Sequence, residues 1–522
     1  MPQLSRTGAL SFIKVCVAVA SLFAATTGLT DTTSPSAPTV PSAVQAGRYI
    51  GLSNHPVESF LGIPYAQPPV GKLRWQTARP LSKTGRPFQA TAYGPACLQP
   101  SSPVNLVAKM SEDCLTLNIW RPASAKAADK PLPVMVWIHG GGFVSGSGQI
   151  PGDVLAQEGV IVVSMNYRLG ALGFFAHPQL DNPVANFGLS DVVKALRWVQ
   201  RNIGTFNGDK DNVTIFGVSA GGMMVNLLLV NQQASGSFHK AISQSGYIAW
   251  PLPVKEKQNQ FAVRDVYGNT MLHAEQQGRE KASQWLEGEA TLKQLKALPG
   301  EVITGRFEGF YSPIVDGVTL ENQPYKLVKT HSNEVSLITG GNSFEGSVMP
   351  YSGYTVPQYL QSWKTFPGQV DLLYKEDWNH SHERAAKRAF GDERYLFSAY
   401  FLGQQWQHKP SPAWLYYIDQ KPTKESPGSP HGYDQQLIFN TFKSQDAKTQ
   451  RLAKTLRNYW VNFAKSGSPV LNTDKTWSAN TQGHPTWLVL PSETEEVNLY
   501  ATRFKSIKTR LENRESTEGN GQ

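Results

Sequence analysis

The link between one short apolar run and a longer one most constrains what this chain can fold into. The β-branched run at 213–216 predicts a strand, and the apolar stretch 220–230 predicts a buried helix. Only Gly217-Val218-Ser219-Ala220-Gly221 connects them, so the chain must pass from strand to helix in a tight turn. The glycines permit that turn because they carry no Cβ that would clash. A G-x-S-x-G pattern in this setting predicts a nucleophilic serine, Ser219.

Several other segments predict a layered α/β fold. Short apolar runs typical of strands buried on both faces lie at 134–138, 160–164, 241–244, 335–339 and 414–418. A helical pattern over 189–203 places its apolar residues three and four positions apart. Strands that alternate with helices predict a mostly parallel central sheet with helices on both faces. We expect residues 250–330 to form an irregular, helical insertion over this sheet.

Composition narrows the class of protein. The chain has 522 residues, of which 40% are hydrophobic, with 13 Trp, 19 Tyr and 23 Phe, and this content excludes wholesale disorder. It has no internal repeat, so we expect one continuous domain. The net charge of +9 is dispersed, without a long run of basic residues. We therefore expect no nucleic-acid partner.

The two ends of the chain differ from the body. Arg6, the apolar stretch 15–25 and the small residues after it predict a signal peptide over 1–30, with an uncleaved anchor or a disordered leader as alternatives. A Ser/Thr/Pro-rich linker is expected over 31–45, the folded domain over 46–504, and a polar, fraying tail over 505–522. No other segment reaches 18 uninterrupted apolar residues, so no membrane span is expected in the mature chain. We expect an exported protein, periplasmic or secreted.

A second glycine motif follows the expected strand at 134–138. In His139-Gly140-Gly141-Gly142-Phe143, consecutive backbone amides can face a ligand. Together with the amide of Ala220, Gly141 and Gly142 predict an oxyanion hole. A dinucleotide loop is disfavoured because Ser145 stands where G-x-G-x-x-G needs its last glycine, and no P-loop lysine follows. We expect His139 to support this loop.

Several motifs along the chain follow one another in a specific order. They are FLGIPYA at 60–66, EDCLTLN at 112–118, NYRLG at 166–170, SQSG at 243–246 and VDG at 315–317. With these motifs, residues from about 45 to 500 resemble the type-B carboxylesterase/lipase family of α/β-hydrolases, in particular its secreted carboxylesterases of bacterial type. The resemblance implies an α/β-hydrolase fold with helical insertions over the active site.

The resemblance also implies the other catalytic residues. Glu345, in the motif GGNSFEG at 340–346, corresponds to the family's acid, and His431, in HGY at 431–433, corresponds to its histidine. The order serine, acid, histidine is the one expected of this fold. Asp434 and Asp316 remain alternative candidates for the acid. We prefer Glu345 because its loop leaves the carboxyl end of a buried strand.

Cysteine usage suggests a disulfide. Only Cys97 and Cys114 lie outside the expected signal peptide. An even pair in an exported chain is compatible with a disulfide or with two separate thiols. The resemblance implies that these two residues form the family's first disulfide.

The sequence gives weaker indications of a substrate pocket and of a metal site. Val218, Trp250, Phe307, Phe310 and Tyr311 could line a pocket or fill the core. The family often has Glu where this chain has Val218, and the loop between the two cysteines has no Trp, so a neutral ester is favoured over a choline ester. Residues 380–383, His-Ser-His-Glu, lack the H-E-x-x-H spacing and predict the start of a solvated helix instead of a metal site.

Together these features predict a serine carboxylic-ester hydrolase that acts on a small-molecule ester through an acyl-Ser219 intermediate. No metal and no organic cofactor are expected. A lipase or an amidase could use the same three residues. A non-catalytic, adhesion-type relative of the fold is the alternative from another class, and it is disfavoured because the chain keeps Ser219, Glu345 and His431.

Overall fold

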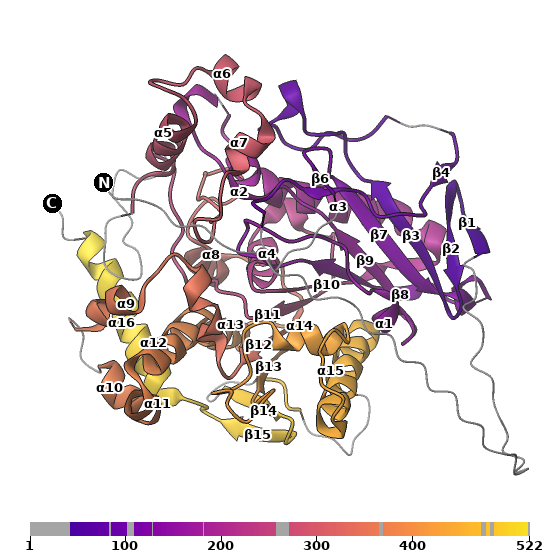
Figure 1. Ribbon diagram of the computed structural model, residues 1–522. Helices are drawn as coiled ribbons and strands as arrows, with labels where there is room; N and C mark the ends of the chain where they lie inside the picture. Colours follow the sequence, from indigo (N-terminus) through magenta and orange to yellow (C-terminus); the bar gives the residue numbers. More distant parts are fainter. Residues whose placement is uncertain are drawn as a thin grey trace, which may run out of the picture. The chain divides into compact units, whose positions relative to one another are not determined.

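A sheet of thirteen strands forms the centre of the protein, seen here in a computed structural model (Figure 1). The structure describes residues 42–519, except 83–84, 102–108, 128, 181, 257–270, 365–368, 471–476 and 481–484. The strands lie in the order β1-β2-β3-β7-β9-β8-β10-β11-β12-β13-β14-β15, with β4 beside β2. Their bounds are β1 (Ser42–Ala46), β2 (Tyr49–Asn54), β3 (Val57–Pro64), β4 (Phe88–Gln89), β7 (Thr116–Pro122), β8 (Leu132–Ile138), β9 (Ile161–Met165), β10 (Gly208–Val218), β11 (Lys240–Gln244), β12 (Ser336–Asn342), β13 (Ala413–Ile418), β14 (Thr486–Leu490) and β15 (Thr494–Val497).

The middle of the sheet is parallel. Neighbouring strands run parallel from β9 through β8, β10, β11, β12 and β13 to β14. Towards the two edges the pairs from β1 to β9 and the pair β14–β15 are antiparallel, and the short β4 pairs parallel with β2. The six runs predicted as strands coincide with β8 to β13 to within one residue at their starts, except that β8 and β10 begin earlier, so that prediction is confirmed. Because parallel strands end at the same edge, the loops after them converge there.

Helices cover both faces of the sheet, and the strand pattern explains why. Along β8, Val134 and Val136 belong to one hydrophobic core, whereas Met135 and Trp137 belong to the other. Alternate side chains of a strand point to opposite faces, so a continuous apolar run requires cover on both. One face packs on α3 (Phe187–Asn202), α4 (Ala220–Leu229) and α13 (Phe397–Trp406), and the other on α1 (Asp153–Ala156), α14 (Tyr433–Ile438) and α15 (Ala447–Ser466).

Two groups of helices lie outside these layers (Figure 1). The segment expected to be an irregular insertion forms α5 (Ala274–Trp285), α6 (Leu292–Ala297), α7 (Gly300–Thr304) and α8 (Pro324–Thr330). The side chains of α5 to α7 share a small core with α2 (Gly170–Gly173) and with Trp75. A second group consists of α9 (Val356–Trp363), α10 (Val370–Leu373), α11 (Lys375–His380) and α12 (His382–Gly391).

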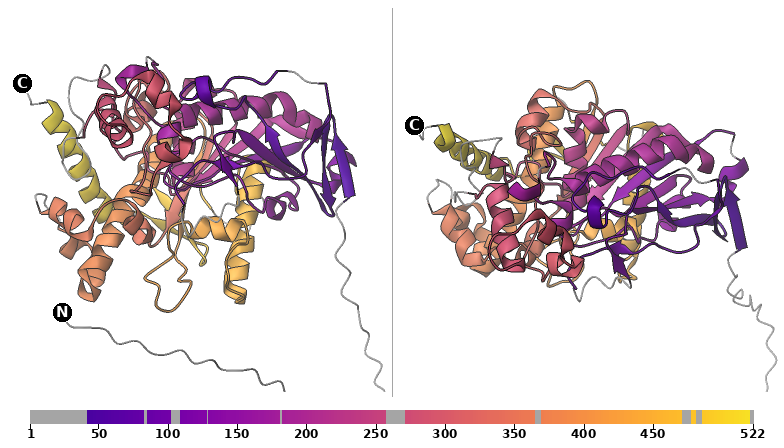
Figure 2. Two further views of the ribbon diagram at one scale, coloured as in Figure 1. Left: turned by 45° about the horizontal axis from the view of Figure 1, so that its top comes forward. Right: turned by 90° about the horizontal axis from the view of Figure 1, so that it is seen from above.

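The C-terminal end differs from the expectation of a polar tail that frays from residue 505. Residues Ala501–Gly519 form helix α16, which lies beside the second group of helices in both views of Figure 2. Phe504 and Ile507 are buried, and Arg510 is only 1% exposed and pairs with Glu393. The expectation is wrong here because it counted polar residues and overlooked the three-residue spacing that places these side chains on one face.

The folded domain also begins earlier in the chain than expected. Strand β1 begins at Ser42 and pairs with β2, so the last residues of the expected linker, 42–45, belong to the sheet. The expected signal peptide, 1–30, and the rest of that linker lie outside the described residues. Among the helices that the structure describes, none combines the length and the apolar character needed to cross a membrane.

Candidate active site

Ser219 lies at the turn that the sequence predicted, between the last residue of β10 and the first residue of α4. Its backbone has φ of 59° and ψ of −121°, a conformation that non-glycine residues rarely adopt. Two hydrogen bonds hold it there: its amide donates to Gln244 O at 2.9 Å, and its carbonyl accepts from Met223 N at 2.7 Å. Strain that the surrounding structure maintains in this way is typical of catalytic positions.

The glycines around Ser219 are required by close backbone contacts. A Cβ added to Gly217 would lie 2.5 Å from Ile138 O, and one added to Gly221 would lie 2.1 Å from the same oxygen. The Ile138 carbonyl at the end of β8 therefore lies close to both glycines of the turn. The loop that follows β8 is close as well, because a Cβ on Gly140 would lie 3.3 Å from the Ser219 Cβ.

That loop carries the second glycine motif. Gly141, Gly142 and Phe143 all have positive φ, of 104°, 62° and 58°. The carbonyl of Gly141 accepts hydrogen bonds from the amides of the next turn, and that of Gly142 accepts from Tyr311 N at 2.8 Å. In the described part of the chain, the Gly141 and Gly142 amides donate to no protein group. The carbonyls are thus fixed while the amides stay available to an anionic oxygen.

Glu345 and His431 meet at the same edge of the sheet. Glu345 is the first residue of a short 3₁₀ helix after β12, and its Oε2 hydrogen-bonds to His431 Nδ1. Its other oxygen, Oε1, accepts from Ser245 Oγ and from Asn342 N, each at 2.6 Å. The His431 amide donates to Ser347 Oγ at 2.8 Å. Both carboxylate oxygens of Glu345 and the backbone of His431 are therefore held in place.

The second ring nitrogen of His431 is in a different situation. His431 Nε2 is buried and has no hydrogen-bond partner among the residues that the structure describes. The imidazole packs against the ring of Tyr395, with centroids 4.6 Å apart. An imidazole whose Nδ1 proton is held by a carboxylate keeps a lone pair on Nε2, which can accept a proton.

The two competing acids have other partners. Asp434 accepts from Tyr416 Oη at 2.7 Å and from Gln244 Nε2 at 3.0 Å. Burial raises its pKa, and the nearby charge of Glu345 raises it further. Asp316 accepts from the amide of Ala185 at 2.9 Å and so fixes a loop. Of the three carboxylates, Glu345 is the one that contacts His431.

Comparison with known proteins places the chain among esterases. A model described as the carboxylesterase family matches residues 39–513. This chain belongs to the carboxylesterase family. It is 31% identical to a para-nitrobenzyl esterase of Bacillus subtilis (strain 168), over 86% of this chain and 94% of that protein. It is 32% identical to a fumonisin B1 esterase of Sphingopyxis macrogoltabida, over 83% of each chain.

Solved structures agree with this placement. A structure titled as a PNB esterase is 28% identical, with a TM-score of 0.74, and covers 90% of this chain and 99% of its own. A thermophilic PNB esterase superposes with a TM-score of 0.73 at 28% identity, and the match covers 88% of this chain and 98% of that one. The chain therefore has the α/β-hydrolase fold and is a serine carboxylic-ester hydrolase, as the sequence predicted.

Two further predictions for this esterase are confirmed. Cys97 and Cys114 form a disulfide with their Cα atoms 4.9 Å apart. His139 supports the glycine loop: its ring stacks on Tyr167, with centroids 4.3 Å apart. Burial lowers the His139 pKa to about 4, so its ring is neutral at physiological pH.

The candidate pocket residues do not form one group. Phe310 packs against the glycine loop, because a Cβ on Gly142 would lie 2.2 Å from Phe310 Cδ1. Trp250 is buried against Phe390. Val218 points into the core on the far face of the sheet, and Phe307 is 38% exposed, so the structure gives these two no place in a pocket. Their positions depend on backbone direction, which the residue types do not reveal.

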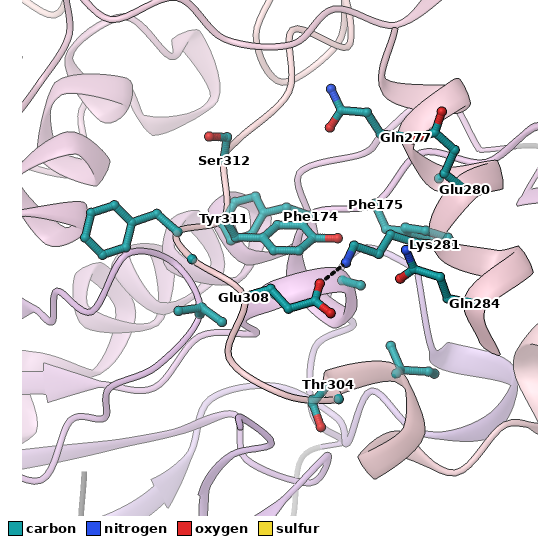
Figure 3. Close-up of a pocket in the computed structure, with 18 of the residues that line it drawn as sticks. Phe174, Phe175, Gln277, Glu280, Lys281, Gln284, Thr304, Glu308, Tyr311 and Ser312 are labelled. Carbon is teal, nitrogen blue, oxygen red and sulfur yellow. Dashed lines mark hydrogen bonds and ion pairs between the residues drawn. The ribbon is translucent and has the colours of Figure 1, made fainter. Parts of the chain in front are cut away.

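A cavity of about 430 Å³ adjoins the site, between α5, α7 and α2 (Figure 3). Phe310 and Tyr311 line it together with Phe174, and Ser219 and His431 are not part of its wall. Lys281 and Glu308 form an ion pair across it. Through Phe310, the wall of this cavity contacts Gly142 of the glycine loop.

At residues 380–383, helix α11 ends at His380 and α12 begins at His382, whose ring stacks on Trp378. Within the described ranges, no group of three or more His, Cys, Asp or Glu side chains could hold a metal ion.

Sequence reasoning missed several residues at the site. Ser245 and Asn342 lie within quoted motifs, but nothing in those motifs assigned them a role as partners of Glu345. Tyr395 and Arg394 lie in a helical segment far from any motif. The contact of Tyr395 with His431 results from tertiary packing, and no local pattern indicates it.

Proposed function

We propose that Ser219, Glu345 and His431 are the catalytic triad of this esterase. The observation that carries the proposal is the asymmetry of the His431 ring. Its Nδ1 is bonded to the buried carboxylate of Glu345, whereas its buried Nε2 has no partner in the described part of the chain. A buried polar atom without a partner is costly and usually indicates a function.

The reaction then follows from these contacts. His431 Nε2 removes the proton of Ser219, whose oxygen attacks the ester carbonyl and forms a C–O bond. When the tetrahedral intermediate collapses, the bond to the alcohol breaks and His431 protonates the departing alkoxide. Water, activated by the same nitrogen, then releases the acid from the acyl-Ser219. Throughout, Glu345 holds the imidazole in the required tautomer and stabilises its positive form.

The oxyanion hole of the proposal consists of the amides of Gly141, Gly142 and Ala220. Ala220 is the first residue of α4, so its amide is one of those that have no partner within the helix. The helix dipole adds partial positive charge at the same point. Donors fixed before the reaction stabilise the oxyanion without reorganisation.

For the substrate and the compartment we propose an ester without a positive charge and export to the periplasm or the medium. The residue before Ser219 is Val218, at a position where the family often has Glu. The Val218 side chain points away into the core. The disulfide between Cys97 and Cys114 supports an oxidising compartment.

Replacement of the serine tests the triad. We expect Ser219→Ala to abolish hydrolysis of p-nitrophenyl butyrate and covalent labelling by a fluorophosphonate, because no other residue would supply the attacking oxygen. The matched control is Ser466→Ala, at an exposed position on α15. If the Ser219→Ala protein still labels stoichiometrically while folded, Ser219 is not the nucleophile.

A further inference from the structure

Arg394 is buried inside a ring of aromatic side chains. It lies in the π-helical turn Asp392–Leu396 between α12 and α13, and it is 4% exposed. We call the five rings around its guanidinium carbon the aromatic cage. Their centroids lie at 4.2 Å (Tyr247), 4.5 Å (Trp250), 5.6 Å (Phe310), 5.7 Å (Tyr395) and 6.0 Å (Phe390).

In the part of the chain that the structure describes, this guanidinium has no carboxylate partner, and its side-chain hydrogen bond is to the hydroxyl of Tyr247. The two acids next to it in sequence are occupied elsewhere: Asp392 pairs with Arg503 at 3.3 Å, and Glu393 pairs with Arg510 at 2.9 Å. Arg394 Nε is buried and donates no hydrogen bond. Arginine stays charged in proteins, so the cage encloses a full positive charge.

The cage touches the reacting groups on two sides. Phe310 packs directly against Gly142 of the glycine loop. Tyr395 packs against the ring of His431. Tyr395 connects the two groups: its ring centroid lies 5.7 Å from the Arg394 guanidinium carbon and 4.6 Å from the His431 ring centroid. A substrate group that extends a few bonds from an ester at Ser219 is therefore directed toward the cage.

A buried charge without a counter-ion is costly, and cation–π contacts offset only part of that cost. The cost is recovered when an anion binds, because charge-assisted hydrogen bonds to arginine are strong at low dielectric. We propose that Arg394 binds a free carboxylate carried by the ester substrate. This inference rests on the proposed esterase function, and it revises the sequence expectation of a neutral ester.

The test compares esters that differ only in that carboxylate. In the first pair, monoethyl glutarate has a carboxylate on the acid part of the ester, and ethyl glutaramate has an amide there. In the second pair, 4-acetoxybutanoate has the carboxylate on the alcohol part, and 4-acetoxybutanamide has the amide there. For at least one pair, we expect the wild-type kcat/KM of the carboxylate to exceed that of the amide by roughly ten- to hundredfold. Ratios near or below one for both pairs would overturn the proposal, whatever any variant does.

Variants then locate the effect. Arg394→Met keeps much of the side-chain volume and should lower the selectivity ratio at least tenfold, whereas Arg394→Lys should keep part of it. The control Lys329→Met removes one exposed charge that lies 5.8 Å from the ring of Phe401, and should leave the ratio unchanged. If Arg394→Met only lowers the melting temperature and keeps the ratio, Arg394 is structural.

The same assay separates this proposal from the catalytic one. If the wild-type enzyme hydrolyses p-nitrophenyl butyrate but does not favour carboxylates, only the role of Arg394 is wrong. If it hydrolyses no ester at all, the esterase function itself fails.

Discussion

The carboxyl ends of the central strands and the contact region of α16 both bury polar side chains, but they differ in how these side chains are paired. At the strand ends, Glu345 is fully engaged while His431 Nε2 has no partner among the described residues. Beneath α16, Arg510 donates to Glu393 and to the backbone and hydroxyl of Ser362. The paired ions beneath α16 fit a structural role, whereas the unpartnered Nε2 of His431 beside a bonded carboxylate fits proton transfer.

The two regions also differ in the contacts that hold their backbone in position. At the strand ends, hydrogen bonds between parallel strands and close glycine contacts fix the backbone, as at Gly221. At α16, long side chains reach across to fix a helix. Variants of the first region should therefore change rates, and variants of the second should change stability.

The largest effect is expected at the acid. Glu345→Gln should lower kcat by about 10³- to 10⁴-fold with little change in KM, because the amide favours the wrong imidazole tautomer. Steady-state kinetics with p-nitrophenyl butyrate, together with a circular dichroism spectrum, would measure it.

Asp434→Asn and Asp316→Asn are the matched comparisons for this prediction. Both carboxylates are buried without contact to His431, so we expect their loss to act mainly through stability or pocket geometry. A collapse of kcat in either folded aspartate variant, with near-normal kcat in Glu345→Gln, would show that the acid has been assigned to the wrong residue.

The next effect is expected at the contact region of α16. Arg510→Met should lower the free energy of unfolding by about 3–5 kcal/mol, because it leaves the buried carboxylate of Glu393 without its cation. Urea denaturation followed by fluorescence would measure it.

A control lies on the same helix. Lys508 forms an exposed ion pair with Glu512 at 3.7 Å, and Lys508→Met should change stability by less than about 0.5 kcal/mol. Equal effects of the two variants would contradict the view that pairing of buried groups holds α16 in place.

A smaller, pH-dependent effect is expected at His139. Its pKa is lowered to about 4 in the folded protein, against roughly 6.5 when unfolded, so the unfolded state binds the proton more tightly. The contribution of neutral His139 is therefore complete above about pH 6.5 and is lost as the pH falls towards 4, by about 3 kcal/mol. His139→Phe should flatten the dependence of unfolding free energy on pH in this window, and an unchanged slope would rule His139 out as its cause.

Much of the fold was predictable because the signals are local. The six apolar runs that became strands β8 to β13 and the helix at 220–229 are visible as continuous apolar stretches, and the helix at 187–202 is visible in the spacing of its apolar residues. The C-terminal helix was missed because its apolar residues are sparse and its stability depends on Glu393, more than a hundred residues away. The residues of the pocket were only partly predicted: Phe310 contacts the glycine loop, whereas Phe307 lies at the surface.

The sequence by itself determined the strand–turn–helix at Ser219 and the glycine loop at 140–142, because each depends on the conformational preferences of a few consecutive residues. Only the tertiary structure decided which carboxylate meets His431, since Glu345 and Asp434 are both buried nearby and differ only in their partners. It alone also placed Arg394 among five aromatic rings that come from three separate segments of the chain. Long-range contacts of this kind depend on how layers pack, and no local pattern encodes them.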